Sequence, residues 1–419
     1  MSPAWRALAF VLVAVPGLLA AQPPSLPPPP PIVEIAFEGN EVTQPRILLR
    51  ELAFRVGDPA EPEKIEAGRQ ALLDLGLFKR VELRQEPVPG GVRLVYKVRE
   101  RYYFLPTPRF DAKSDGQYSY GAQVRWSNLF GLNHSARLFW EQEDRQREGI
   151  GKETTWSAGY SAPLIGDSPY SIGAGAGYTT RPVSGSAGDY EEEFRSAAAS
   201  LSRTWSAGAA SQGWTFGGGL LWQQQRTAGP FAPAAYGEAL APRVFGGHRD
   251  LHYRIYSESG QAWGLNYEQA VDGWGSDYDY SRLGAGYVSY LPLGSTPHQT
   301  LHLIADTGLY FDGPPGVRQY ALGGASRLRG YDASFIEGNA YWYASAELAR
   351  PLFRPWLRAV LLLEAGSVSA SPDTLDGEVY GSLGIGLRLR FTNFVNFELE
   401  AGFALPLDGG DARFFASRV

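Results

Sequence analysis

The sequence lacks cysteine, which excludes disulfide bonds and thiolate metal sites. Beyond residue 21 it also lacks any apolar run of the roughly 20 residues that a helix needs to cross a hydrocarbon core. Its formal net charge is −6 over 419 residues, so there is no basic excess to attract nucleic acid. If this chain enters a membrane, it must therefore do so as a β-barrel.

Glycine and aromatic residues are plentiful instead. The chain has 50 Gly, 23 Tyr, 21 Phe and 11 Trp. Aromatic side chains suit the pleated surface of a sheet, and glycine suits tight turns and crowded strand faces. This composition predicts a mainly β protein.

The first 31 residues read as a leader and a spacer. In residues 1–21, Arg6 supplies a positive charge, an apolar core follows, and Leu19-Ala20-Ala21 is a small-residue cleavage site. A membrane anchor is the alternative, but the apolar run ends too early to span. We therefore expect a signal peptide over 1–21 in an exported bacterial protein. The proline-dense residues 22–31 predict a stiff linker.

Residues 32–100 predict a compact α/β unit with the order strand, helix, helix, strand, strand. Pro45 lies in the first turn of the first helix, which we expect to run to about Leu52. Gly76 ends the second helix, in which apolar residues recur at helical spacing. Two strands follow, over 78–85 and 92–98.

From residue 102 to 419 the pattern changes to period two. Within 379–391, for example, Leu383, Ile385 and Leu387 fall on one face, and Gly384, Gly386 and Arg388 fall on the other. Long alternating segments separated by turns are typical of a transmembrane β-barrel. We count about 16 such segments, an even number as single-chain bacterial barrels have. Two long connections interrupt them, over 226–249 and 312–338, and strand counting puts the second at the outer end of the barrel.

Several motifs resemble one family. Residues 35–40 (Ile-Ala-Phe-Glu-Gly-Asn) and 72–78 (Leu-Leu-Asp-Leu-Gly-Leu-Phe), followed by Val81, are similar to the opening strand and the helix–strand signature of a POTRA domain. Leu328-Arg329-Gly330-Tyr331 stands where the bacterial surface antigen barrel has its Val-Arg-Gly-Phe/Tyr motif. The chain resembles the BamA/TamA superfamily of outer-membrane assembly factors along essentially its whole mature length, in a short form with one POTRA domain at 32–100.

The resemblance implies that the loop over 312–338 folds back into the barrel, where an acidic residue of the inner wall holds Arg329. By parity Glu364 and Glu347 both lie on the inner face of their strands. A carboxylate there can pair with a guanidinium through charge-assisted hydrogen bonds. We expect Arg329 to pair with Glu364, with Glu347 as the second choice. The alternative is that Arg329 is an ordinary exposed loop charge.

The resemblance also predicts a function, namely insertion or translocation of unfolded β-rich outer-membrane or secreted clients in the bacterial outer membrane. The small domain would lie in the periplasm and add an incoming strand to a sheet edge. The barrel would offer a second edge, a lateral seam between its first and last strands, where Gly409 and Gly410 weaken closure. The residues expected to capture the client strand are Phe78, Val81, Val92, Leu94 and Tyr96.

Three alternatives remain, namely a two-partner secretion transporter with one dedicated client, a passive channel, and a barrel enzyme. We find no catalytic motif and expect no enzymatic activity, cofactor or metal. His248 and His252 have a metal-compatible spacing but no third ligand of the usual kind, so a solvated rim is the better interpretation. Besides clients and outer-membrane lipid, accessory periplasmic or inner-membrane proteins are conceivable partners that the sequence does not identify.

Overall fold

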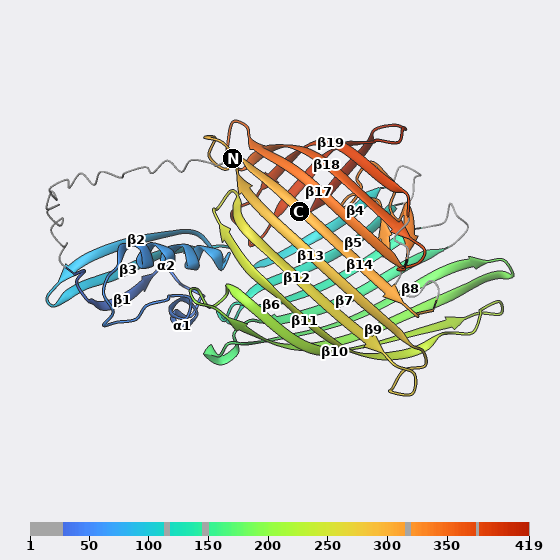
Figure 1. Ribbon diagram of the computed structural model, residues 1–419, viewed down its shortest axis with the longest axis horizontal. Coiled ribbons are helices and arrows are strands. Elements are labelled where there is room, and N and C mark those ends of the chain that lie inside the picture. The colour runs from blue at the N-terminus through green and yellow to red at the C-terminus, as the bar shows by residue number, and fades with distance from the viewer. Residues whose placement is uncertain (1–27, 113–117, 145–150, 315–319, 374–376, 419) are drawn as a thin grey trace, which may run out of the picture.

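The computed structural model describes residues 28–112, 118–144, 151–314, 320–373 and 377–418. The expected signal peptide and most of the proline-rich linker lie outside the described residues. A small N-terminal α/β domain stands at one end of a large curled sheet (Figure 1). Within the described ranges, no helix is both long and apolar enough to cross a membrane.

The N-terminal domain has the element order that the sequence predicts. Its elements are β1 (Ile32–Glu38), α1 (Pro45–Leu49), α2 (Pro62–Asp74), β2 (Phe78–Val88) and β3 (Gly91–Glu100). The sheet order is β1-β3-β2, with β1 parallel and β2 antiparallel to β3. Helix α1 ends at Leu49, three residues before the expected end at Leu52.

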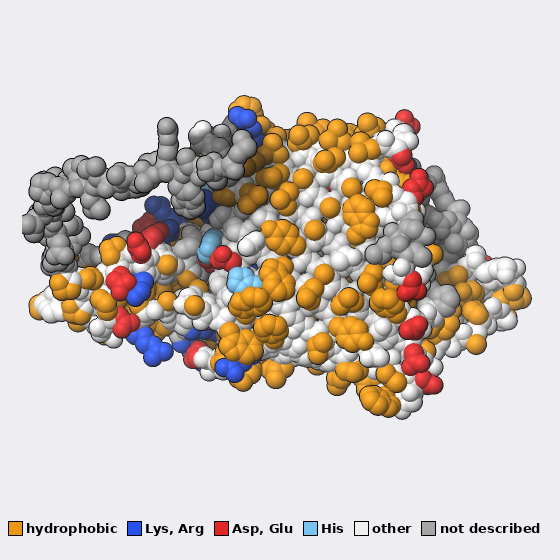
Figure 2. Space-filling view, in the orientation of Figure 1, with side chains coloured by type: hydrophobic (Ala, Val, Ile, Leu, Met, Phe, Trp, Pro, Cys, Tyr) orange, Lys and Arg blue, Asp and Glu red, His pale blue; other side chains and the backbone are white. Residues whose placement is uncertain are grey.

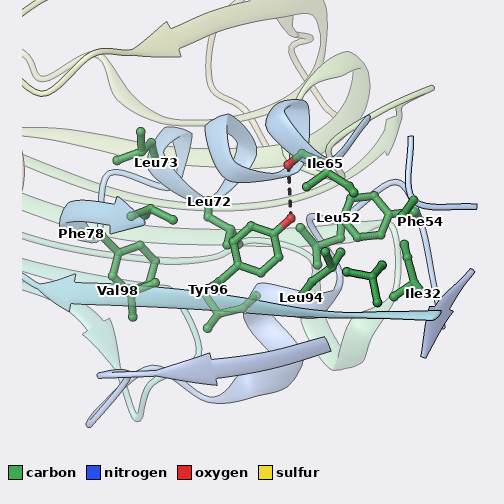
Figure 3. Packing of buried hydrophobic residues seen from close by; sticks show 14 of the residues in the cluster. Ile32, Leu52, Phe54, Ile65, Leu72, Leu73, Phe78, Leu94, Tyr96 and Val98 are labelled. Carbon is green, nitrogen blue, oxygen red and sulfur yellow. Dashed lines mark hydrogen bonds between the residues drawn. The ribbon is translucent and has the colours of Figure 1, made fainter. Parts of the chain in front are cut away.

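The core of this domain lies between α2 and β3. Leu72 of α2 and Leu94 of β3 are fully buried, and the hydroxyl of Tyr96 donates a hydrogen bond to the carbonyl oxygen of Ile65 at 3.2 Å (Figure 3). Gly68 lets the helix approach the preceding segment, because a Cβ there would lie 2.9 Å from the ring of Phe54. This packing holds α2 against the face of the sheet, and the helix does not cover the outer edges of β1 and β2.

Sixteen strands form the large sheet, each antiparallel to its neighbours, which confirms the predicted mainly β architecture. They are β4 (Phe104–Ala112), β5 (Tyr118–Leu129), β6 (His134–Asp144), β7 (Lys152–Ala162), β8 (Tyr170–Gly185), β9 (Gly188–Trp205), β10 (Gly213–Ala228), β11 (Gly237–Tyr253), β12 (Glu258–Ala270), β13 (Tyr280–Pro292), β14 (Thr300–Phe311), β17 (Ala340–Pro351), β18 (Leu357–Ser369), β19 (Val379–Arg390), β20 (Glu398–Pro406) and β21 (Arg413–Arg418). A short hairpin of β15 (Tyr320–Leu322) and β16 (Ile336–Gly338) lies between β14 and β17.

One expected connection is wrong. Most of 226–249 belongs to β10 and β11, which pair over thirteen residue positions from Gly213↔Arg249 to Gln225↔Gly237. The glycines and prolines near residue 230 form only a hairpin loop. Pro242 is tolerated inside β11 because the ladder to β12 begins one residue later, at Arg243↔Glu268, so its missing N–H breaks no bond.

The period-two pattern places apolar side chains on one face of the sheet and polar side chains on the other, as predicted. Leu383, Ile385 and Leu387 of β19 are exposed on the outer face, whereas Arg388 is buried on the inner face. Figure 2 shows apolar side chains spread over the outer face, with carboxylates gathered at the rim far from the N-terminal domain. An apolar exterior around a polar interior is the arrangement that a transmembrane barrel requires.

Candidate functional site

The connection between β14 and β17 runs back into the sheet instead of away from it. Leu328 at its tip is fully buried, and Arg329 and Tyr331 are each only 7% exposed. The β15–β16 hairpin packs against β17 and β18 at the base of this connection. The Leu-Arg-Gly-Tyr motif therefore lies against the inner wall, and the alternative of an exposed loop arginine is wrong.

Arg329 contacts three carboxylates of the wall. Its Nη2 donates a hydrogen bond to Oε1 of Glu347 at 2.6 Å, and its Nη1 lies 3.4 Å from Oε1 of Glu400. Its backbone N–H donates to Oε2 of Glu364 at 2.8 Å, and its Nε lies 3.8 Å from Oε1 of the same residue. Both expected partners are present: Glu347 makes the closer contact with the guanidinium, and Glu364 binds the loop backbone while also lying within ion-pair distance of the guanidinium.

Other donors explain why Glu364 lies farther from the guanidinium than Glu347 does. The hydroxyl of Tyr343 donates to Oε1 of Glu364 at 2.6 Å, and the hydroxyl of Ser382 donates to Oε2 at 2.7 Å. With the backbone N–H of Arg329, the carboxylate accepts three hydrogen bonds from three chain segments. Glu364 thus holds the loop backbone by hydrogen bonds and makes only a longer ion pair with the arginine side chain.

A second arginine completes the buried charge cluster. Arg388 of β19 donates to Oε2 of Glu347 at 2.6 Å and forms an ion pair with Glu400. His302 lies on the other side of Glu347, with its Nδ1 3.1 Å from Oε2. Buried ions persist only when they are paired and hydrogen-bonded, so each member of this cluster depends on the others.

Gly330 and Tyr331 fit the loop to the wall. A Cβ on Gly330 would lie 2.8 Å from the backbone nitrogen of Pro406 and 2.9 Å from Cβ of Ser382, so only glycine fits there. The hydroxyl of Tyr331 donates to Oδ1 of Asp408 at 2.7 Å. The motif is therefore held at its backbone, its charge and its ring.

The motif also reaches the last strand. The guanidinium of Arg329 lies 5.3 Å from the ring centroid of Phe415 in β21. Gly409 and Gly410, predicted to weaken the seam, lie in the turn that precedes β21, with φ of 102° and 129°. These are left-handed values that favour glycine, so the two residues shape the turn.

The two ends of the sheet are β4 and β21. In the part of the chain that the structure describes, no ladder joins them. A cavity of about 750 Å³ lies between them, lined by residues of β4, β21 and the loop, among them Pro108, Ala416, Ala325 and Ser326. Within the described residues, the two ends of the sheet therefore lie beside the buried loop.

The N-terminal domain is docked on the near rim of the barrel. Asp74 accepts the backbone N–H of Tyr253 at 2.7 Å and pairs with His252 at 2.9 Å. Further contacts join the domain to the β5–β6, β9–β10 and β19–β20 turns: Gln44 Nε2 to Phe130 O at 2.8 Å, Ser211 N–H to Glu51 at 3.0 Å, and Arg101 Nη1 to Phe394 O at 3.0 Å. These turns are widely separated in the strand order, so the domain spans much of the mouth.

Glu51 is a buried acid in this contact. It is only 1% exposed, and burial raises the pKa of its carboxyl above the ordinary value. The backbone N–H of Ser211 and the charge of Arg50 oppose this shift but do not cancel it. In the docked domain, the carboxyl of Glu51 therefore holds its proton more tightly than the carboxyl of a solvated glutamate does.

The residues expected to capture a client strand fall into two groups. Val92, Leu94 and Tyr96 lie on β3, the central strand, whose two edges are taken by β1 and β2, so β3 has no free edge to which a client strand could add. Phe78 and Val81 lie on β2, an edge strand, but their side chains are buried in the core. Only the backbone edges of β1 and β2 can accept a strand.

Comparisons with known proteins agree with this architecture. A POTRA model described as "Surface antigen variable number repeat" matches residues 30–101, and a model described as "Omp85 superfamily domain" matches residues 247–412. An outer membrane protein assembly factor BamA from Nitratidesulfovibrio vulgaris is 34% identical over 80 residues, 19% of this chain. That match spans 9% of the BamA chain.

Solved structures share the fold at low identity. BamA from Haemophilus ducreyi lacking POTRA domains 1–3 superposes with a TM-score of 0.55 at 19% identity, covering 93% of this chain and 84% of the other. CdiB from Escherichia coli superposes with a TM-score of 0.68 at 16% identity, covering 92% and 75%. The fold is that of a POTRA domain followed by a 16-stranded barrel. The chain belongs to the Omp85 superfamily and is of the BamA/TamA type, with one POTRA domain in this sequence.

Proposed function

We propose that this protein inserts β-rich client chains into the bacterial outer membrane or passes them across it, with its POTRA domain in the periplasm. The observation that supports the proposal is the pair of sheet ends, β4 and β21, which no ladder joins in the described residues and which lie beside a loop held by Arg329, Glu347 and Glu364. A barrel that only conducts solutes needs neither feature. The proposed role makes and breaks no covalent bond, so it requires no catalytic residue.

The POTRA domain would act first. An unfolded strand arrives with unsatisfied N–H and C=O groups, and the free edge of β2 can pair with them by adding a strand to the sheet. Capture then rests on the backbone of β2, because Phe78 and Val81 are turned into the core. The docked position of the domain holds this edge close to the barrel mouth.

The seam would act second. A strand cannot enter lipid with unpaired backbone groups, so insertion needs a template edge at membrane depth. The ends of the sheet at β4 and β21 would supply such an edge, since no ladder joins them in the described residues. The buried loop beside them would keep the lumen filled while the edge is in use.

Depletion separates this role from its alternatives. When the protein is removed from the cell and the outer-membrane proteins are inventoried, loss of many barrels supports general assembly. Loss of one exported protein instead supports two-partner secretion. Loss of none, together with a wide and steady conductance that Arg329→Ala leaves unchanged, would support a passive channel and contradict the proposal.

A further inference from the structure

Two prolines lie on the open edge of the sheet. The first strand, β4, contains Pro106 and Pro108 and pairs with β5 on one side only. The N–H and C=O groups of successive strand residues point alternately toward the two edges of the strand. One known hydrogen bond therefore shows toward which edge the groups of every other residue point. The N–H of Ser127 donates to the carbonyl oxygen of Tyr103 at 2.8 Å, and therefore the odd residues of this strand face β5.

The even residues consequently face the seam. The N–H of Tyr102 confirms the direction, since it donates at 2.8 Å to the carbonyl oxygen of Asn393, in the β19–β20 turn on the far side of the seam. Phe104, Pro106 and Pro108 follow on the same side by alternation. Since proline has no N–H, the seam edge of β4 from 104 to 108 offers three carbonyl acceptors and a single donor, at Phe104.

The opposite edge is chemically different. The N–H of Phe391 donates to the carbonyl oxygen of Phe397 at 2.9 Å, so the odd residues of β19 and β20 pair with each other. Even residues of β20 then pair with odd residues of β21, as in Gly402↔Phe415. Phe414 and Ala416 of β21 therefore point their backbone groups at the seam, and each offers both an N–H and a C=O.

The space between the two edges is open. The cavity of about 750 Å³ has Pro108 at one side and Ala416 at the other. Charged residues line it toward the lumen and leucines line it toward the outer face, among them Arg109, Glu400, Leu387 and Leu399. An extended backbone seated here would run between polar and apolar surroundings, as a barrel strand does.

We propose that Pro106 and Pro108 prevent the two ends of the sheet from joining by a continuous ladder, and that β21 is the edge that accepts a client strand. This rests on the proposed insertion role. A strand paired with β4 would leave its carbonyl groups opposite two prolines without donors, which lipid cannot supply. A strand paired with β21 meets donors and acceptors at both Phe414 and Ala416.

Hydrogen exchange tests the part played by the prolines. In Pro106→Ala/Pro108→Ala, two N–H donors return to β4, and the seam-facing amides of Phe414 and Ala416 are expected to exchange about tenfold more slowly, the scale of one or two net hydrogen bonds. Pro242→Ala is the matched control, because Pro242 also lies within a strand, in β11, at a position where its missing N–H breaks no ladder bond. Protection of the amides of Phe414 and Ala416 already in the parent, or unchanged exchange of these amides in the double variant, would overturn the proposal.

Cysteine cross-linking tests the accepting edge. The chain contains no cysteine, so Phe414→Cys or Phe104→Cys gives one reactive site in the protein reconstituted in liposomes. The probe is an unfolded eight-stranded outer-membrane barrel with one cysteine in its last strand. Disulfide formation is expected at position 414 and not at 104, and cross-links at 104 are expected to appear once both prolines are replaced.

The remaining outcomes are also decisive. Equal or better capture at 104 in the parent overturns the assignment of β21. Capture at neither position counts against the insertion role and the accepting edge together, whereas the exchange measurement still decides whether the prolines hold the seam open. Migration of unheated samples on a gel verifies that each variant has folded.

Discussion

The Nη2 atom of Arg329 lies 2.6 Å from Oε1 of Glu347, and both side chains are almost fully buried. This contact joins a loop tip to a barrel strand eighteen residues further along the chain. The same glutamate also accepts Arg388, so the loop is bonded to a wall that is itself cross-linked. A loop held in this way keeps one position in the lumen until the buried charges separate.

Arg329→Ala is expected to destabilise the barrel, because Glu347 and Glu400 would then share Arg388, and Glu364 would lose its ion pair. Removal of one partner of a buried ion pair costs about 3–5 kcal/mol. The measurement is the denaturant midpoint for loss of the fast-migrating folded form. Arg329→Lys keeps the charge but loses the planar guanidinium, so its denaturant midpoint should lie between those of the parent and Arg329→Ala. An unchanged midpoint for Arg329→Ala would mean that the ion pairs of Arg329 do not hold the loop against the wall.

Gly330→Ala is expected to push the loop off the wall, because its Cβ would meet Pro406 and Ser382 at under 3 Å. Overpacking of this kind costs about 1–3 kcal/mol. The measurement is single-channel conductance in planar bilayers, which should rise as the loop leaves the lumen.

Gly159→Ala in β7 is the matched control, since its Cβ would meet nothing within 4 Å. Equal conductance for Gly330→Ala, Gly159→Ala and the parent would mean that the close fit at Gly330 does not hold the loop.

Glu51 should make docking of the POTRA domain depend on pH. Because burial raises the pKa of Glu51, the docked state binds its proton more tightly than the undocked state does. Docking is therefore strongest below the ordinary glutamate pKa and weakens as pH rises through the raised value. Glu51→Gln keeps an acceptor for the N–H of Ser211 without the charge, so it should tighten docking at neutral pH and remove this pH dependence.

The measurement is hydrogen exchange of the β9–β10 turn as a function of pH, corrected for intrinsic exchange. Glu82→Gln, on the partly exposed face of β2, controls for a general loss of one negative charge. If the parent and Glu51→Gln show the same pH profile, the buried carboxyl does not govern docking.

Parity made much of the barrel predictable from sequence. Alternation of Leu383, Gly384, Ile385 and Arg388 determines which face meets the exterior, and that pattern is strictly local. The same rule put Glu364 and Glu347 on the inner wall. Parity gives the face of a strand but not the distance across the lumen, so it could not decide which carboxylate meets the guanidinium. Glu400 was missed as a partner for this reason, although its place on the polar face was visible.

Sheet order was the other limit. Val92, Leu94 and Tyr96 alternate as an edge strand would. However, β3 is central, because β1 from the start of the domain pairs with it in parallel on the side opposite β2. Such pairing joins residues some sixty positions apart and leaves no local signature. Similarly, the sequence predicted a long connection over 226–249, because it does not show that this stretch pairs with β10 and, from Arg243 on, with β12. Strand identity is local information, whereas strand neighbours depend on the whole fold.

The most direct test of the assembly role is made with purified components. The protein is reconstituted in liposomes, an unfolded eight-stranded outer-membrane barrel is added, and the appearance of its protease-resistant folded form is followed in time. The account predicts faster folding than in protein-free liposomes, with the gain lost when the POTRA domain is omitted. Equal rates with and without the protein would contradict it.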